Sequence, residues 1–168
     1  MLNTATTFLA LLQEDDMDIK SIAIDKLELL VDNNWVEISD NIKILEDLYK
    51  NRQCDREKSI ALILSKLYYN LEDYEYAIEW ALESSTKFNY LDKNQYVSTI
   101  LKKIIDKYIN TKKHNFYNKE EPKFLDPRIE NIINNIFTTC INNREFNQAI
   151  GIAIESFNIE KVVFKFNH

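Results

Sequence analysis

Few side chains in this sequence have the types and the spacing that metal binding or phosphate chemistry requires. His114 and His168 are the only histidines, and neither has another histidine or a cysteine at zinc-ligand spacing. The single glycine, Gly151, excludes a glycine-rich phosphate-binding loop of the usual kind. Trp35 and Trp80 could form a surface on which a ligand stacks, but aromatic residues at this spacing more often belong to a core. We therefore predict no metal, no cofactor and no small-molecule substrate.

The nucleophilic side chains are better explained by structure than by catalysis. Cys140 continues an apolar stripe with the spacing of a buried helix face, whereas a reactive thiolate needs an accessible, electropositive setting. Ser84 and Ser156 occupy matching positions at predicted helix ends, which favours a structural role. Cys54 and Cys140 form no disulfide framework, as is typical of a reducing intracellular compartment. We predict that the chain is not an enzyme.

An internal repeat organises the chain. Residues 74–84 and 146–156 both read aromatic-x-x-Ala-Ile-x-x-Ala-aliphatic-Glu-Ser, and aligning Tyr74 with Phe146 gives an offset of 72 residues. A helical apolar run and a short polar break precede each copy, so each copy is predicted to be the second helix of a helix-turn-helix unit. Stacked helix pairs usually form binding platforms rather than active sites. The structural repeat positions are Tyr74, Ala77, Ala81, Phe146, Ala149, Gly151 and Ala153.

Composition supports an all-α fold. The 168 residues include one glycine and two prolines, too few turn-formers for a β-sandwich or a β-barrel. The formal net charge of −6 argues against a nucleic-acid partner, which would require a basic face. No apolar run approaches the roughly 18 residues of a membrane span, and the N-terminus lacks the basic region of a secretory signal.

Apolar periodicity and capping residues predict the helices. Asp55 is expected to cap the fourth helix, and Asp92 with Gln95 resembles a capping box at the start of the sixth. Asp126 followed by Pro127 is typical of an N-cap and a first helical residue. The predicted helices cover about 6–13, 18–32, 35–50, 55–68, 74–84, 92–108, 127–142 and 146–156, and a ninth apolar pattern runs from Ile159 to Phe166.

The predicted architecture is a single domain over residues 1–168. It is a right-handed α-solenoid of about nine helices stacked as antiparallel pairs, similar to tetratricopeptide or HEAT repeats. The polar segment 111–125 is expected to be a mobile loop, because its apolar pattern stops. Gly151 is expected to permit close approach by a neighbouring helix. Because the ninth pattern has no partner after it, we expect the chain to be the beginning of a longer protein with an exposed apolar end.

Four collinear parts of the sequence resemble one known family. They contain, in order, residues 9–16; residues 30–40, including Trp35 and Asp40; residues 65–69 with Asp73 and Tyr74; and residues 126–130 with Phe137, Cys140 and 148–155. The family is that of the larger of the two non-ATPase scaffold subunits in the base of the proteasome 19S regulatory particle, which are built around a toroid of proteasome/cyclosome repeats. Residues 111–125 and 159–168 do not match it.

The resemblance implies an N-terminal helical rod in a larger subunit. The implied function is a non-catalytic scaffold that organises lid and base subunits for ubiquitin-dependent protein degradation, in the cytoplasm and nucleus. The implied partners are other regulatory-particle subunits, with no nucleic acid, membrane or small-molecule substrate. An alternative is a free-standing tetratricopeptide-like adaptor that binds a peptide or partner helix in a concave groove, and an all-α enzyme is a third.

Overall fold

The computed structural model describes residues 4–52 and 55–156. These residues form eight α-helices and one short 3-10 helix, and no strand occurs among them. Their contacts divide the chain into two compact units, Met1–Ile100 and Leu101–His168. The elements are α1 (Ala5–Leu11), α2 (Met17–Ser39), α3 (Ile42–Lys50), α4 (Glu57–Asn70), α5 (Tyr74–Glu83), η1 (Ser85–Lys87), α6 (Gln95–Tyr117), α7 (Pro127–Asn142) and α8 (Phe146–Glu155). The predicted all-helical fold is confirmed for the described residues, and the predicted ninth helix lies outside them.

The predicted second and third helices are partly merged in α2. The Asp16 side chain caps its start by accepting hydrogen bonds from the Asp18 and Ile19 amides at 2.8 and 3.3 Å. Asn34 then leaves the helical conformation, with φ −117° and ψ 22°, and the helix resumes after it. The predicted break before Trp35 is confirmed as this kink, but the predicted third helix does not run unbroken to Lys50, because α2 ends at Ser39 and α3 begins at Ile42.

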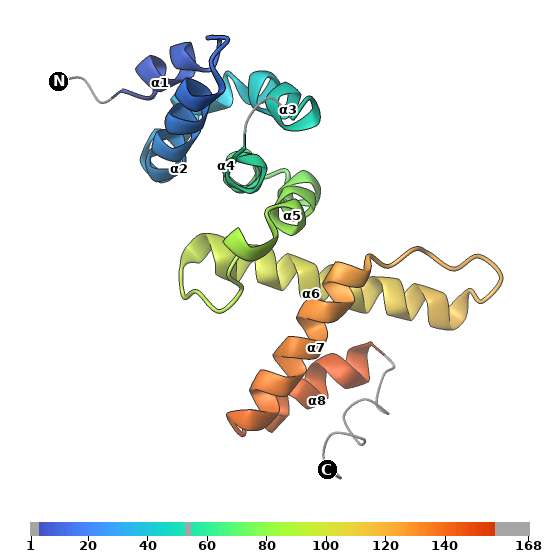
Figure 1. Ribbon diagram of the computed structural model, residues 1–168. Coiled ribbons are helices and arrows are strands. Elements are labelled where there is room, and N and C mark those ends of the chain that lie inside the picture. Colours follow the sequence, from blue (N-terminus) through green and yellow to red (C-terminus); the bar gives the residue numbers. More distant parts are fainter. Residues whose placement is uncertain (1–3, 53–54, 157–168) are drawn as a thin grey trace. The chain divides into compact units, whose positions relative to one another are not determined.

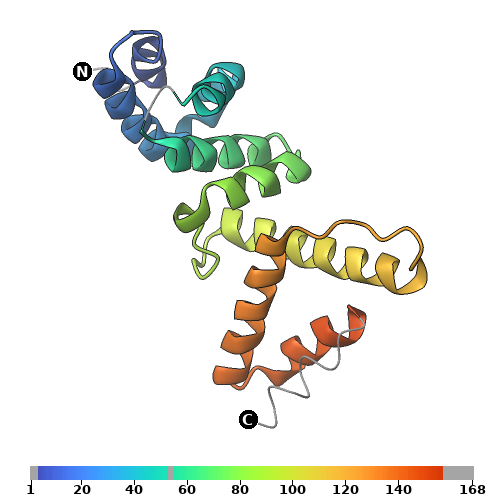
Figure 2. The same ribbon diagram turned by 45° about the vertical axis from the view of Figure 1, so that its right-hand side comes forward.

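The first unit is built around α4. Every side chain from Ser59 to Ser65 is buried, as is Leu67, because α4 packs against α2, α3 and α5. This helix lies between its neighbours, consistent with its nearly continuous burial (Figures 1 and 2). The predicted cap was wrong: α4 begins at Glu57, and its N-cap residue, Arg56, makes no capping side-chain bond. The position of α4 is therefore determined by the burial of its apolar side chains and not by an N-cap.

The internal repeat extends to the backbone of the turns. Glu72 follows α4 and Arg144 follows α7, 72 positions later, and both adopt a left-handed conformation with φ 61°. The next amides, of Asp73 and Glu145, donate to the carbonyl five residues earlier, at 3.0 and 2.7 Å. This arrangement is a Schellman motif, which ends one helix and redirects the chain into the next. The α4–α5 and α7–α8 pairs therefore share one turn, and α8 turns back along α7 as predicted (Figure 2).

The inner face of the repeat is also shared. Ala77 and Ala81 of α5 are buried, as is Ala153 of α8. The buried Ser84 hydroxyl donates to the Ala81 carbonyl at 2.7 Å, and the Ser156 hydroxyl donates to the Ala153 carbonyl at 3.4 Å. Each serine is the C-cap residue of its helix. The predicted structural role of the two serines is confirmed.

The other repeat positions are placed less uniformly. Tyr74 is half-buried at the first position of α5 and packs near Tyr69, with ring centroids 6.4 Å apart. Phe146 occupies the matching first position of α8, and Ala149 follows in the same helix. The side chains of Phe146 and Ala149 lie outside what the structure describes, so the predicted contact of Ala149 with α7 stays a prediction.

The sixth helix is longer than its sequence pattern predicted. It begins at Gln95, where the Asn94 side chain, rather than Asp92, accepts from the Val97 amide at 2.8 Å. It continues to Tyr117, so the prediction of a loop starting at residue 111 is wrong. Lys112 explains the extension: its ammonium lies 3.1 Å from a Glu130 carboxylate oxygen on α7 and 5.6 Å from the centre of the Tyr108 ring. These polar contacts stabilise the last turns of α6, which carry no stripe of apolar side chains.

The segment after α6 is anchored by a single side chain. The Asn115 amide accepts from the Lys123 backbone N–H at 2.7 Å and donates to its carbonyl at 2.9 Å. Asp126 then caps α7 by accepting from the Arg128 amide at 2.8 Å, with Pro127 as first helical residue, as predicted. Hydrogen bonds from Arg128 also hold the pKa of Asp126 below its ordinary value. The non-helical segment is therefore 118–126.

Limited proteolysis should locate this segment. Within residues 95–142, we expect trypsin to cut first after Lys119, because Lys112 and Lys113 are helical and the Lys123 backbone is held by Asn115. Mass spectrometry of early fragments would identify the cleaved bond. Asn115→Ala should make the bond after Lys123 more susceptible, whereas first cleavage after Lys112 or Lys113 would contradict the helix described here.

No helix of the described residues approaches Gly151 closely. A β-carbon added there would meet no heavy atom within 4 Å, so the close approach expected from the sequence is absent from the described part of the chain. Its repeat counterpart is Glu79, which lies on the exposed face of α5. The glycine therefore costs backbone entropy in a helix interior without a packing gain in the described part of the chain.

We accordingly expect Gly151→Ala to stabilise the chain. The free energy of unfolding should rise by about 0.5–1 kcal/mol, because alanine restricts the unfolded chain and fits the open site. Urea unfolding and amide exchange of α8 would measure the change. Ala153→Gly is the matched control in the same helix and should have the opposite sign. A lower stability of Gly151→Ala would show that the site is crowded.

Candidate interaction surface

The structure describes one of the two cysteines, Cys140 on α7, and one of the two histidines, His114 on α6. Cys140 is buried, and burial, followed by the nearby negative charge of Glu145, raises the pKa of its thiol. The predicted inert, buried thiol is confirmed for Cys140, while Cys54 lies outside the described residues. His114 lies in the last turn of α6. Within residues 4–52 and 55–156, no group of three or more His, Cys, Asp or Glu side chains is placed to hold a metal ion.

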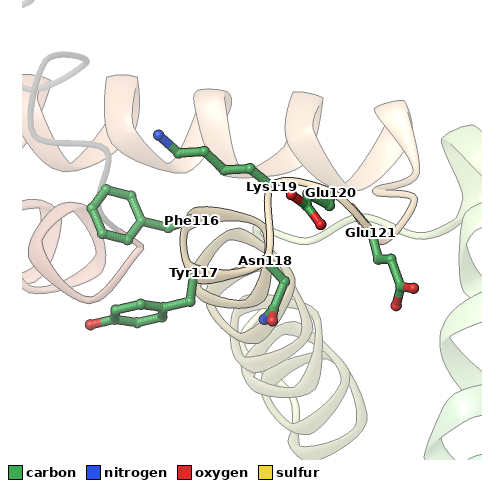
Figure 3. A pocket seen from close by; sticks show the side chains of 6 residues that line it. All are labelled: Phe116, Tyr117, Asn118, Lys119, Glu120 and Glu121. Atoms are coloured by element: carbon green, nitrogen blue, oxygen red, sulfur yellow. The ribbon is translucent and has the colours of Figure 1, made fainter.

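A hollow at the end of α6 lacks the features of a ligand-binding site. Phe116 to Glu121 line it, so all of its lining comes from one continuous segment. Figure 3 shows the Phe116 and Tyr117 rings extending to one side, while the Glu121 side chain points away on the other. Ligand sites usually gather polar groups that converge from several elements, and this hollow has none of that convergence.

The outer face of α2 presents a row of exposed apolar side chains. Ile22 and Leu29 are seven residues apart and so lie on one side of the helix, and the exposed Val36 follows seven residues later, beyond the kink at Asn34. Leu29 is the most open, with 73% of its surface exposed. Ile22 is exposed although it directly precedes Ala23, so its apolar character alone does not assign it to the buried face that contains Ala23 and Leu27. These three exposed residues repeat every seven positions, and none of them coincides with a buried position. This spacing is the sequence signal that distinguishes them from the buried face.

Some apolar side chains of α8 are exposed at positions whose counterparts in α5 are buried. Ile78 and Leu82 of α5 are buried, whereas the matching Ile150 and Ile154 of α8 are 39% and 56% exposed. The matching alanines Ala81 and Ala153 are thus buried alike, whereas the matching aliphatic residues are not. The apolar pattern from Ile159 to Phe166, predicted to continue this face, lies outside the described residues. Among the described helices none is long and apolar enough to cross a membrane.

Comparison with known proteins agrees with these features. Residues 3–167 match the family described as the N-terminal domain of 26S proteasome subunit RPN2. The chain is 36% identical over 160 residues to the 26S proteasome non-ATPase regulatory subunit 1 of Dictyostelium discoideum, covering 95% of this chain and 16% of that protein. It is 37% and 34% identical to the 26S proteasome regulatory subunits RPN2 of Candida glabrata and Saccharomyces cerevisiae, covering 96% and 95% of this chain and 17% of each relative.

The chain thus spans about one sixth of the length of the curated relatives it matches, 16% and 17% of the proteins named above. The names of these relatives describe regulatory and non-ATPase subunits, which agrees with the prediction that the chain is not an enzyme. The helical content, the repeated helix hairpin and the near-complete sequence match lead to one assignment. The chain belongs to the family of the N-terminal domain of 26S proteasome subunit RPN2.

Proposed function

We propose that this chain is part of a non-catalytic scaffold of the proteasome regulatory particle that organises lid and base subunits for ubiquitin-dependent protein degradation. The observation that carries the proposal is the family match over residues 3–167, together with relatives named as proteasome regulatory subunits. The cytoplasm and the nucleus are the compartments that we propose for this role.

The mechanism of such a scaffold is geometric. Helix hairpins joined by the same rigid turn, as in α4–α5 and α7–α8, suit a right-handed solenoid in which each pair stacks on the next. A stack of this kind holds its partners at fixed spacing without any chemistry of its own. The row on α2, made of Ile22, Leu29 and Val36, supports the proposal because exposed apolar side chains on a helix mark a surface for a partner protein.

Affinity purification from the native cell tests this proposal. The endogenous protein would carry an epitope tag, and co-purifying proteins would be identified by peptide mass spectrometry. We expect other regulatory-particle subunits of both lid and base. Recovery of a single client peptide or protein without the particle would instead favour the free-standing adaptor and would overturn the scaffold role.

A surface variant tests the α2 row itself. Replacing Ile22, Leu29 and Val36 with serine should reduce recovery of the neighbouring subunits while leaving the helical content intact, because all three side chains are exposed. The control replaces Lys26, Asn33 and Asp40 with serine, which are exposed at the same seven-residue spacing. Equal recovery with both variants would exclude the row as a contact surface.

A further inference from the structure

The first unit carries a cluster of aromatic rings held in place by carboxylates. On α3 and α5, the Tyr49 and Trp80 rings meet edge to face with centroids 4.9 Å apart, and the Tyr49 hydroxyl donates to Glu83 at 2.8 Å. Next to them, the Tyr68 ring of α4 stacks on the Tyr76 ring of α5, with centroids 5.1 Å apart and an interplanar angle of 25°. The rings are therefore fixed in orientation before any partner arrives.

The Tyr68 hydroxyl ties the third helix into the same cluster. It donates to a Glu46 carboxylate oxygen on α3 at 2.8 Å. Burial, followed by this bond, raises the pKa of Tyr68, so its proton remains on the oxygen and the bond persists. The six residues Tyr49, Tyr68, Tyr76, Trp80, Glu79 and Glu83 form what we call the aromatic–acidic surface.

Negative charge dominates this surface. The α5 helix carries Glu75, Glu79 and Glu83 and no lysine or arginine, and two further acidic residues, Glu72 and Asp73, precede it. Glu79 and Glu83 are exposed beside Tyr76, whose ring is half open to solvent. On α3 the basic side chain of Lys50 lies 3.6 Å from Glu46 of the same helix.

The second copy of the repeat shows that the hairpin does not require these residues. The two copies share a buried alanine, at Ala81 and Ala153, and the C-cap serine, as described above. In the sequence of the second copy, Gln148, Gly151 and Ile152 replace Tyr76, Glu79 and Trp80, so it lacks the acidic charge and the rings of these positions. Because the same hairpin forms without them, the exposed Tyr76 and Glu79 are not required by the hairpin.

We propose that the aromatic–acidic surface binds an arginine-bearing helix of a partner protein. A guanidinium group stacks on tyrosine and tryptophan faces and pairs with carboxylates, so one side chain satisfies both parts of the surface. Tyr76, Glu79, Trp80 and Glu83 follow one another over two turns of α5. A partner helix with arginines three or four residues apart matches that spacing. The inference does not depend on the proposed scaffold role.

Binding of defined peptides to the 168-residue chain tests the proposal. The probe is a fluorescent amphipathic helical peptide of alanine, leucine and arginine, with arginines three and four residues apart. Two comparison peptides replace every arginine with lysine or with glutamate. We expect the arginine peptide to bind roughly two- to fivefold more tightly than the lysine peptide, because stacking adds to charge. The glutamate peptide should not bind.

Three variants locate the site. Tyr76→Ser should weaken binding of the arginine peptide by roughly two- to fivefold, and Glu79→Lys by about tenfold. Glu14→Lys makes the same charge change at an exposed turn between α1 and α2 and should leave binding unchanged. Circular dichroism would confirm that each variant is folded. Absence of binding, equal binding of arginine and lysine peptides, or equal weakening by Glu14→Lys and Glu79→Lys would each overturn the proposal.

Discussion

Replacing Phe137 with alanine is expected to lower the free energy of unfolding by about 3–5 kcal/mol. The Phe137 ring is almost completely buried on α7, within a stripe that contains Ile133, Ile136 and Cys140. Removing it forfeits the burial of a large apolar surface and leaves a cavity that the surrounding helices fill only in part. A domain of this size is stable by roughly 5–15 kcal/mol, so the loss is a large fraction of the total.

Urea unfolding followed by circular dichroism would measure this loss. Phe124→Ala is the matched control in the same unit, because that ring is 83% exposed in the segment between α6 and α7. Its effect should stay within about 0.5 kcal/mol. Similar losses for the two variants would show that Phe137 is not packed as described.

The repeat made part of this fold predictable. A strong apolar period interrupted by a short polar break predicts several element boundaries. These are the end of α4, the bounds of α5 and α7, and the start of α8. The cap at Asp126 and Pro127 was predicted because both residues act locally. Such features need only the neighbouring residues along the chain, and the sequence contains all of them.

Features that depend on distant residues were not predicted. The last turns of α6 are polar, and they persist because Lys112 reaches Glu130 across to α7. The start of α6 was misplaced for a local reason, because Asp92 and Asn94 are both capping residue types and it is Asn94 that accepts the capping bond from Val97. Ile22 is exposed although it lies beside the buried face of α2, which its apolar character does not reveal. No periodic pattern contains these contacts.

The residues of the candidate surfaces were also predicted only in part. The sequence assigned Trp80 to the core, and the structure packs Trp80 against the core cluster. Its edge-to-face contact with Tyr49 was not predicted. The pairing of rings from α3, α4 and α5 depends on how three helices meet, which a single-helix pattern cannot specify.

Ser65 shows that the repeat does not predict every side chain inside the core. Its repeat counterpart is Phe137. Both positions are buried, but the first copy fills its position with a hydroxyl. The Ser65 hydroxyl donates to the Ala77 carbonyl at 2.6 Å, so its oxygen must accept from the Tyr96 hydroxyl, 2.7 Å away. Burial raises the pKa of Tyr96, so that its proton stays available to donate. The repeat therefore fixes burial at this position but not its chemistry.

Ser65→Ala is consequently expected to cost about 1–3 kcal/mol of unfolding free energy, because it leaves the buried Tyr96 hydroxyl without its acceptor. Tyr96→Phe removes the donor instead and should cost less, since Ser65 still donates to Ala77. In the double variant both polar groups are gone, so its loss should be smaller than the sum of the two single losses. Urea unfolding of the four proteins gives this coupling directly. Additive losses would show that the two hydroxyl groups do not depend on one another.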